Sequence, residues 1–173
     1  EMSQWEIQID CINDDGLRQT HFLEKRNCNT EFTTYIERNY RNWLRSDDRP
    51  NMSFDVISQY IAPHFELQIP VYFIIIDCMR LDQYLAIQPY IQELFDEEMD
   101  LYYSILPTAT PYSRNAIFSG MLPIDIAKHF PEYWNTTEEM DNSRNRNEHQ
   151  LLDEHITELG YNLNPSSKIG RAS

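Results

Sequence analysis

The sequence predicts an α/β fold, in which a parallel sheet with flanking helices follows a helical segment. Val71–Ile76 is the most apolar run of the 173-residue chain. Six apolar residues without polar alternation are typical of a strand buried on both faces of a parallel sheet. After Pro70, strand-like and helix-like stretches alternate, which favours right-handed βαβ units. Before Pro70, the apolar residues follow helical spacing in patches.

Residues 1–69 are predicted to form a helical spacer. Over residues 32–43 aromatic and aliphatic side chains recur at helical spacing, which indicates an amphipathic helix whose apolar stripe faces a core. The polar stretch Asp47–Asn51 breaks this helix. Ser53 is a suitable N-cap for a second helix that runs to about Ile61, because its hydroxyl can accept a hydrogen bond from a free backbone N–H. No catalytic pair is evident in this spacer.

After residue 70 the ends of the elements have local signals. Pro111 suits the first turn of a helix, and Gly120 suits the left-handed residue at which that helix stops. Pro89 splits the predicted helical stretch 82–95, because a proline is tolerated in the first turn of a new helix. Residues 135–147 are polar and acidic and are predicted to form an exposed loop. The predicted elements are strands at 71–76, about 100–106 and from 161, and helices at 82–95, 110–119, 123–130 and 148–159.

Two polar residues lie where α/β sheets bind their ligands. Asp77 directly follows the apolar run, and ligands bind beyond the carboxyl ends of such strands. Thr110 opens a helix after the second predicted strand, where backbone N–H groups and the helix dipole favour an anion. A threonine hydroxyl needs a metal or a base to act as a nucleophile, and no histidine lies within five residues of Thr110. The two residues together predict a metal-dependent phosphoryl or phosphodiester hydrolase.

Each candidate also has a structural interpretation. Thr110 can simply cap its helix, and Asp77 can stabilise the turn after a strand. Thr108 is the alternative nucleophile. Arg80 and Arg114 are candidates for binding a substrate phosphate, because a guanidinium group binds phosphate oxygens in a bidentate manner. Either arginine can instead form a structural ion pair.

Composition limits the function classes. The net charge of −14, from 28 acidic and 14 basic residues, argues against a surface that coats nucleic acid. It does not exclude a small phosphodiester held by a metal ion. No run of 18 apolar residues predicts a membrane span, and the polar N-terminus is unlike a secretory leader. Three cysteines without CxxC spacing, at 11, 28 and 78, favour reduced thiols and a cytoplasmic location.

Four stretches carry a family resemblance: IIIDCMRLDQY (74–84), YYSILPTATPYSRNAIFSGMLP (102–123), HFPEYW (129–134) and NRNEHQLLDEHITELG (145–160). Together they resemble the PglZ domain of the alkaline phosphatase superfamily, and in particular PorX-type response regulators of the type IX secretion system. Matched residue by residue, the resemblance implies that Asp77 is a metal ligand. It implies that Thr110 is the nucleophile and also contacts a metal.

The resemblance implies zinc as the cofactor, with two ions in the full-length protein, and small or oligonucleotide phosphodiesters as substrates. It implies a helical spacer at 1–69, followed at 70–173 by the N-terminal part of a PglZ domain with an incomplete alkaline-phosphatase-like sheet. Relatives take further Asp and His ligands from the second half of the domain. No convincing pair of Asp and His metal ligands follows residue 110, so the remaining ligands are expected beyond residue 173.

The resemblance also implies partners: a sigma factor or a component of the secretion system, and a second copy of the full-length protein in a homodimer. A different function stays open. The domain can be a catalytically inactive binding or regulatory module, in type IX secretion signalling or in phage resistance. The presence of Asp77 and Thr110 favours the enzyme, and the helical spacer favours a response regulator over a phage-resistance protein.

Overall fold

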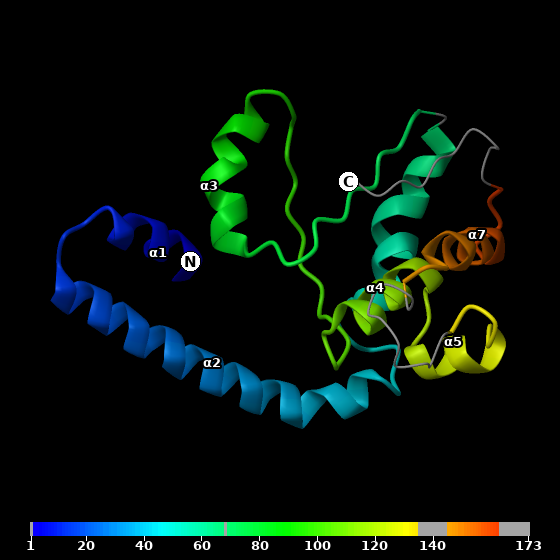
Figure 1. Ribbon diagram of the computed structural model, residues 1–173, viewed down its shortest axis with the longest axis horizontal. Coiled ribbons are helices and arrows are strands. Elements are labelled where there is room, and N and C mark those ends of the chain that lie inside the picture. The colour runs from blue at the N-terminus through cyan, green and yellow to red at the C-terminus, as the bar shows by residue number, and fades with distance from the viewer. Residues whose placement is uncertain (1, 68, 135–144, 163–173) are drawn as a thin grey trace. The chain divides into compact units, whose positions relative to one another are not determined.

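The computed structural model of the protein describes residues 2–67, 69–134 and 145–162, which belong to two compact units (Figure 1). The first unit contains Glu1–Arg49 and Ile76–Asp100, and the second contains Pro50–Ile75 and Leu101–Ser173. The chain therefore leaves the first unit, returns to it once and leaves it again. The predicted division at residue 69 concerns domains rather than compact units, and it stays a prediction.

The first unit contains α1 (Met2–Asp10), α2 (Asp15–Trp43) and α3 (Leu81–Gln92). The helix predicted over residues 32–43 is confirmed as the last part of α2. Asp14 caps the start of α2, because its carboxylate accepts a hydrogen bond of 3.0 Å from the N–H of Leu17. Lys25 of α2 forms an ion pair of 2.6 Å with Glu6 of α1 and so links the two helices.

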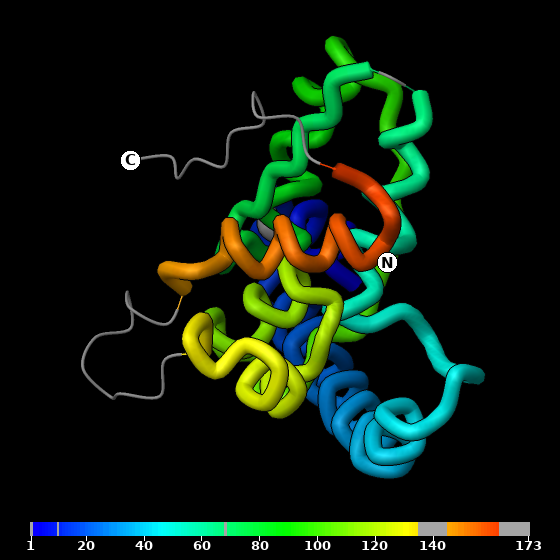
Figure 2. Tube along the Cα trace, turned by 90° about the vertical axis from the view of Figure 1, so that its right-hand side faces the viewer, coloured from blue at the N-terminus to red at the C-terminus, as the bar shows by residue number. Residues whose placement is uncertain are grey.

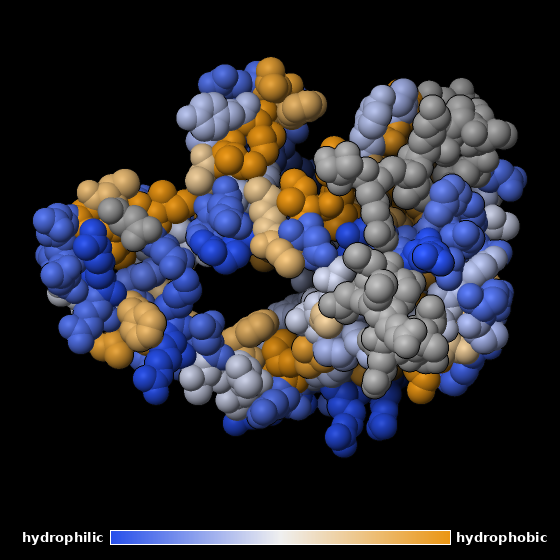
Figure 3. All heavy atoms as spheres, viewed as in Figure 1, coloured by the Kyte–Doolittle hydropathy of each residue, from blue (hydrophilic) through white to orange (hydrophobic). Residues whose placement is uncertain are grey.

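The apolar stripe of α2 is less buried than the sequence predicts. Trp43 is buried and contacts Tyr35 edge-on, with ring centroids 5.6 Å apart. Tyr35 and Phe32 are nevertheless 46% and 53% exposed. The reason is length: α1 has nine residues and α2 has 29, so α1 can cover only part of its neighbour. Apolar side chains also gather on the surface over α3 (Figure 3), and the exposed ones include Leu81 and Ile87.

The second unit contains short helices before residue 68 and longer ones after residue 109. The predicted helix at 53–61 is present, but it begins with a 3₁₀ turn whose N-cap is Met52 rather than Ser53. Helical turns continue to Leu67, beyond the end predicted at about Ile61. The helices predicted at 110–119, 123–130 and 148–159 are confirmed to within one residue. The elements are η1 (Ser53–Asp55), η2 (Ile57–Ile61), η3 (Ala62–Leu67), α4 (Thr110–Ser119), α5 (Pro123–His129) and α7 (Glu148–Glu158).

The predicted parallel sheet is not confirmed, because none of the residues that the structure describes forms a strand. Residues 71–76 form no helix or strand, and their burial alternates. Phe73 packs against the core of the second unit, whereas Tyr72 and Ile74 are 85% and 76% exposed. A strand requires a neighbouring backbone for its N–H and C=O groups, and no described segment pairs with 71–76.

The strand predicted near 100–106 is reduced to one parallel bridge between Tyr103 and Met52. The N–H of Ser53 donates to the carbonyl of Tyr103 at 3.0 Å, and the N–H of Tyr103 donates to Asn51 at 2.8 Å. The hydroxyl of Ser53, predicted to cap a helix, instead accepts a hydrogen bond of 3.1 Å from the N–H of Ile105. The third predicted strand, from 161, extends outside the described residues.

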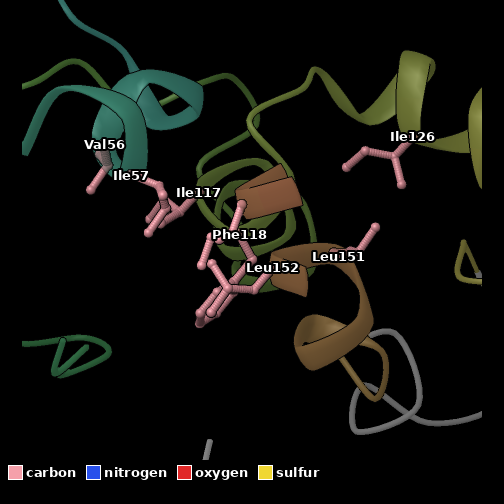
Figure 4. Close-up of a cluster of buried hydrophobic side chains, with 8 residues drawn as sticks. Val56, Ile57, Ile117, Phe118, Ile126, Leu151 and Leu152 are labelled. Atoms are coloured by element: carbon pink, nitrogen blue, oxygen red, sulfur yellow. The ribbon is translucent and has the colours of Figure 1, made fainter. Parts of the chain in front are cut away.

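The core of the second unit lies between η2, α4, α5 and α7 (Figure 4). Figure 2 shows α7 running beside α4, with which it packs. The C-terminal half of α4 contributes most of its buried surface, and this packing fixes the helix that Thr110 opens. The buried apolar residues are Val56, Ile57, Ile117, Phe118, Ile126, Leu151, Leu152 and Ile156. No helix among the described residues is long and apolar enough to cross a membrane.

His155 of α7 is a buried titratable group beside this core. It is 7% exposed, and its Nδ1 lies 3.1 Å from the carbonyl oxygen of Phe118. Because a carbonyl can only accept, Nδ1 carries the proton. Burial lowers the pKa of His155, and the Phe118 carbonyl and Glu158 oppose that shift. The folded protein therefore favours the neutral imidazole.

We expect the free energy of unfolding to fall as the pH drops below about 6.5. A histidine whose pKa is lowered by folding leaves the free energy of unfolding at its full value above the unfolded pKa of about 6.5. Below that pH the unfolded chain binds the proton more readily than the folded protein does, so the free energy of unfolding falls by up to about 1.4 kcal/mol per pH unit. Urea unfolding at several pH values checks this. His155→Gln should flatten the dependence. An unchanged slope in His155→Gln would contradict the assignment.

Candidate functional site

Thr110 is the first residue of α4, as predicted, and it is partly buried. The N-cap position belongs to Ala109, whose backbone is extended at φ −62° and ψ 140°. The interpretation of Thr110 as the N-cap residue is therefore wrong. Pro111 follows, and its fixed φ suits the first turn of the helix.

The helix start offers fewer backbone donors to an anion than the sequence predicts. Pro111 has no N–H, and the N–H of Tyr112 donates to the carbonyl of Ala109 at 2.9 Å. Attraction of an anion to this end therefore depends mainly on the helix dipole. Thr108, the alternative nucleophile, is exposed two residues before α4. The hydroxyl of Ser113 lies 3.4 Å from the Thr108 carbonyl and 3.3 Å from the Ala109 carbonyl, so it bonds back to this turn.

Asp77 lies in an exposed turn after the extended segment. Its Oδ1 accepts a hydrogen bond of 2.9 Å from the N–H of Cys78. Cys78 has φ +60°, a left-handed conformation that is uncommon outside glycine, and this bends the chain directly after Asp77. Asp77 belongs to the first unit and Thr110 to the second. Their combination in one site stays a prediction.

Arg80 is the N-cap residue of α3 and is bound by a carboxylate of the same helix. Its Nε and Nη2 donate to the two oxygens of Asp82 at 2.9 and 2.6 Å. This bidentate pair lowers the pKa of Asp82 and raises that of Arg80, mainly through the side-chain hydrogen bonds. The geometry favours a structural ion pair for Arg80, although a role in binding substrate stays a prediction.

Arg114 lies one turn into α4 and connects it to α7. Its Nη2 donates to Glu148 at 2.8 Å, and its guanidinium lies 5.9 Å from the ring centroid of Phe118. Glu148 is buried, and its other oxygen accepts a hydrogen bond of 2.6 Å from Asn145. Asn145 itself is buried, so the prediction of an exposed loop is wrong at this residue, while residues 135–144 lie outside the described part. This network favours the structural interpretation of Arg114.

Replacing Arg114 by methionine is expected to lower the free energy of unfolding by about 3 kcal/mol, because it leaves the buried Glu148 carboxylate without its cation. The double variant Arg114→Met/Glu148→Leu should recover most of that loss, since it removes both charges. Urea unfolding of the single and double variants measures the coupling. Equal stability of Arg114→Met and the unchanged protein would show that the pair is not structural.

The described residues do not by themselves form a metal site. No group of three His, Cys, Asp or Glu in residues 2–67, 69–134 and 145–162 lies close enough to hold an ion. A zinc site in a protein takes three or four such ligands. The part of the chain that the structure describes therefore does not fit a complete zinc site. All three cysteines, predicted to be reduced, are exposed free thiols.

Comparison with known families agrees with the motifs around Asp77 and Thr110. Residues 56–167 match the BREX system PglZ alkaline phosphatase-like domain. Residues 1–44, which include α1 and α2, match the PorX response regulator linker domain. No curated protein matches the chain. Because the first match covers more than half of the residues and includes the motifs of both candidate site residues, the chain belongs to the PglZ family of alkaline phosphatase-like domains.

Proposed function

We propose that the chain is part of a metal-dependent phosphodiesterase or phosphatase-like domain of a two-component response regulator, acting on small or oligonucleotide phosphodiesters. The observation that carries the proposal is the position of Thr110 at the first residue of α4, within an alkaline phosphatase-like family. The match of residues 1–44 to a response regulator linker supports the signalling context. A cytoplasmic location, a homodimer and a sigma factor or secretion-system partner belong to the same proposal.

In this proposal the Thr110 oxygen attacks the phosphorus atom of the ester. The Thr110 hydroxyl gives its proton to water as the new P–O bond forms. The bond to the departing oxygen breaks, and that oxygen takes up a proton from water. A second water then attacks the phosphorus of the threonyl ester, which releases the phosphate product and restores the Thr110 hydroxyl. The positive end of the α4 dipole stabilises the negative charge beside Thr110.

Zinc is the proposed metal, with two ions in the full-length protein and Asp77 and Thr110 among the contacts. Because the described residues do not form a complete zinc site, the other ligands in this proposal come from outside them. The steps assigned to Thr110 above do not depend on where those ligands lie.

A second candidate function is a PglZ-type binding or regulatory module without activity, in type IX secretion signalling or phage resistance. One observation favours it. The guanidinium groups of Arg80 and Arg114 are both hydrogen-bonded to carboxylates, of Asp82 and Glu148. Neither group is then ready to receive a substrate phosphate, as an active phosphodiesterase would need from such residues.

Hydrolysis of bis(p-nitrophenyl) phosphate by the full-length natural protein separates the two functions. The enzyme should be active with zinc, inactive after chelation and active again when zinc is restored. Asp77→Asn should lower activity beyond the roughly 10–100-fold that loss of a supporting residue around a metal costs. Asp96→Asn, which removes an exposed carboxylate from the same unit, is the matched control. Full activity in Asp77→Asn would reject its role as ligand. Zinc binding without hydrolysis of this ester or of oligonucleotides would favour the module.

A further inference from the structure

A cleft of about 670 Å³ lies in the first unit along α1 and α2. Its volume is within the range of sites that hold small molecules, roughly 300–1,000 Å³. The lining side chains from α2 repeat every three or four residues, which places them on one face of the helix. Those that matter here are Ile9 of α1 and Arg18, His21, Phe22, Lys25 and Arg26 of α2.

The cleft is basic in a chain whose net charge is −14. Its one lining carboxylate, Glu6, uses both oxygens to bind Lys25, at 2.6 and 2.7 Å. The Nη2 of Arg18 donates to the carbonyl oxygen of Ile12 at 3.0 Å, and its ion pair with Asp15 is long, at 3.5 Å, with an Asp15 side chain that is 99% exposed. Such an exposed pair neutralises little charge. Arg26 has no acidic partner among the described residues, so the cleft keeps an excess of positive charge.

His21 has an unsatisfied hydrogen-bonding capacity at the same place. Both of its ring nitrogens are shielded from water, and neither has a hydrogen-bond partner among the described residues. A shielded polar group without a partner is unfavourable, because it has lost its hydrogen bonds to water. An oxygen that accepts a hydrogen bond from the ring would remove this penalty. The apolar lining is also incompletely covered, because Phe22 is 64% exposed.

We propose that this cleft binds a small phosphate monoester, with Arg18, His21 and Arg26 contacting the phosphate. A guanidinium fork matches the geometry of phosphate oxygens and forms charge-assisted hydrogen bonds. Ile9 and Phe22 contact the organic part of the ester. The site lies in the segment that matches a response regulator linker and is separate from Thr110, which belongs to the other unit. It is a ligand site additional to the proposed hydrolase function.

Calorimetric titration of the full chain with phenylphosphonate, in the presence of a chelator, tests this site with a probe that cannot be hydrolysed. We expect saturable binding, weaker binding of inorganic phosphate and weaker binding of benzoate. Arg26→Gln should weaken phenylphosphonate binding by at least about tenfold, as loss of a hydrogen bond to a charged group does. Arg38→Gln removes the same charge from an exposed position of α2 outside the cleft and should leave binding unchanged.

Four results would overturn the proposal: no binding by the unchanged chain, equal weakening in Arg26→Gln and Arg38→Gln, loss of binding in Thr110→Ala, or benzoate binding as tightly as phenylphosphonate. The first two exclude a specific site in the cleft. The third assigns the probe to the other unit, and the fourth identifies a carboxylate site. Arg26 is exposed, so Arg26→Gln should fold, and circular dichroism is the independent check of its folding.

Discussion

Replacing Thr110 by alanine is expected to reduce hydrolysis of a bis-aryl phosphate by the full-length protein at least about a thousandfold, as removal of the nucleophile does in other hydrolases. The hydroxyl stands at the first residue of α4, and no backbone group can take over the attack on phosphorus that we propose for it. Thr110→Ser keeps a hydroxyl and should retain measurable activity. Initial rates at saturating zinc, with melting temperatures of each variant, measure both effects.

Thr108→Ala is the matched control, because it removes the same hydroxyl two residues earlier, where the side chain is exposed. It should change the rate by less than about threefold if Thr110 acts alone, which is far below the effect of losing a nucleophile. The opposite pattern, a large loss in Thr108→Ala and little change in Thr110→Ala, would exchange the two roles. Loss of activity together with a lowered melting temperature in Thr110→Ala alone would indicate a structural effect. Measurable activity in Thr110→Ser, which keeps the hydroxyl, would then still support Thr110 as the nucleophile.

The helices of the second unit after residue 109 could be predicted because their ends are encoded locally. Pro111 and Pro123 each stand in the first turn of a helix, and Gly120 has the positive φ of 68° that its position after α4 requires. The position of Thr110 at a helix start followed from the same signals. Its exclusion from the N-cap could not be predicted, since Ala109 is a poor capping residue by preference.

The sheet and the environment of the arginines depend on partners that are distant in sequence. The apolar composition of a run such as 71–76 predicts burial, but a strand also needs a neighbouring backbone to pair with. Among the described residues Tyr72 and Ile74 stay exposed. Arg114 meets Glu148 only because α4 packs against α7, 34 residues later. An acidic residue in the first turn of α7 was the one local signal, and it predicts a dipole contact rather than this pair.

Replacing Gly120 by alanine is expected to lower the free energy of unfolding by about 2–5 kcal/mol, the sum of two unfavourable effects. A left-handed backbone is unfavourable for an L-residue by roughly 1–2 kcal/mol, and Gly120 has φ +68°. A Cβ there would also overlap Nε2 of His155 and lie 2.5 Å from its Cε1. The imidazole cannot move away freely, because it is buried and bonded to the carbonyl of Phe118.

Gly160→Ala is the matched control that isolates the steric part. Gly160 follows α7 with φ +87°, but nothing lies within 4 Å of the position of its Cβ. Its substitution should therefore show the backbone effect alone, roughly 1–2 kcal/mol. In a His155→Ala background the effect of Gly120→Ala should fall toward the same value, because the clashing ring is gone. Urea unfolding of the unchanged protein, Gly120→Ala, His155→Ala and the double variant measures this coupling. Equal losses for Gly120→Ala and Gly160→Ala would mean that α4 and α7 do not pack closely at His155.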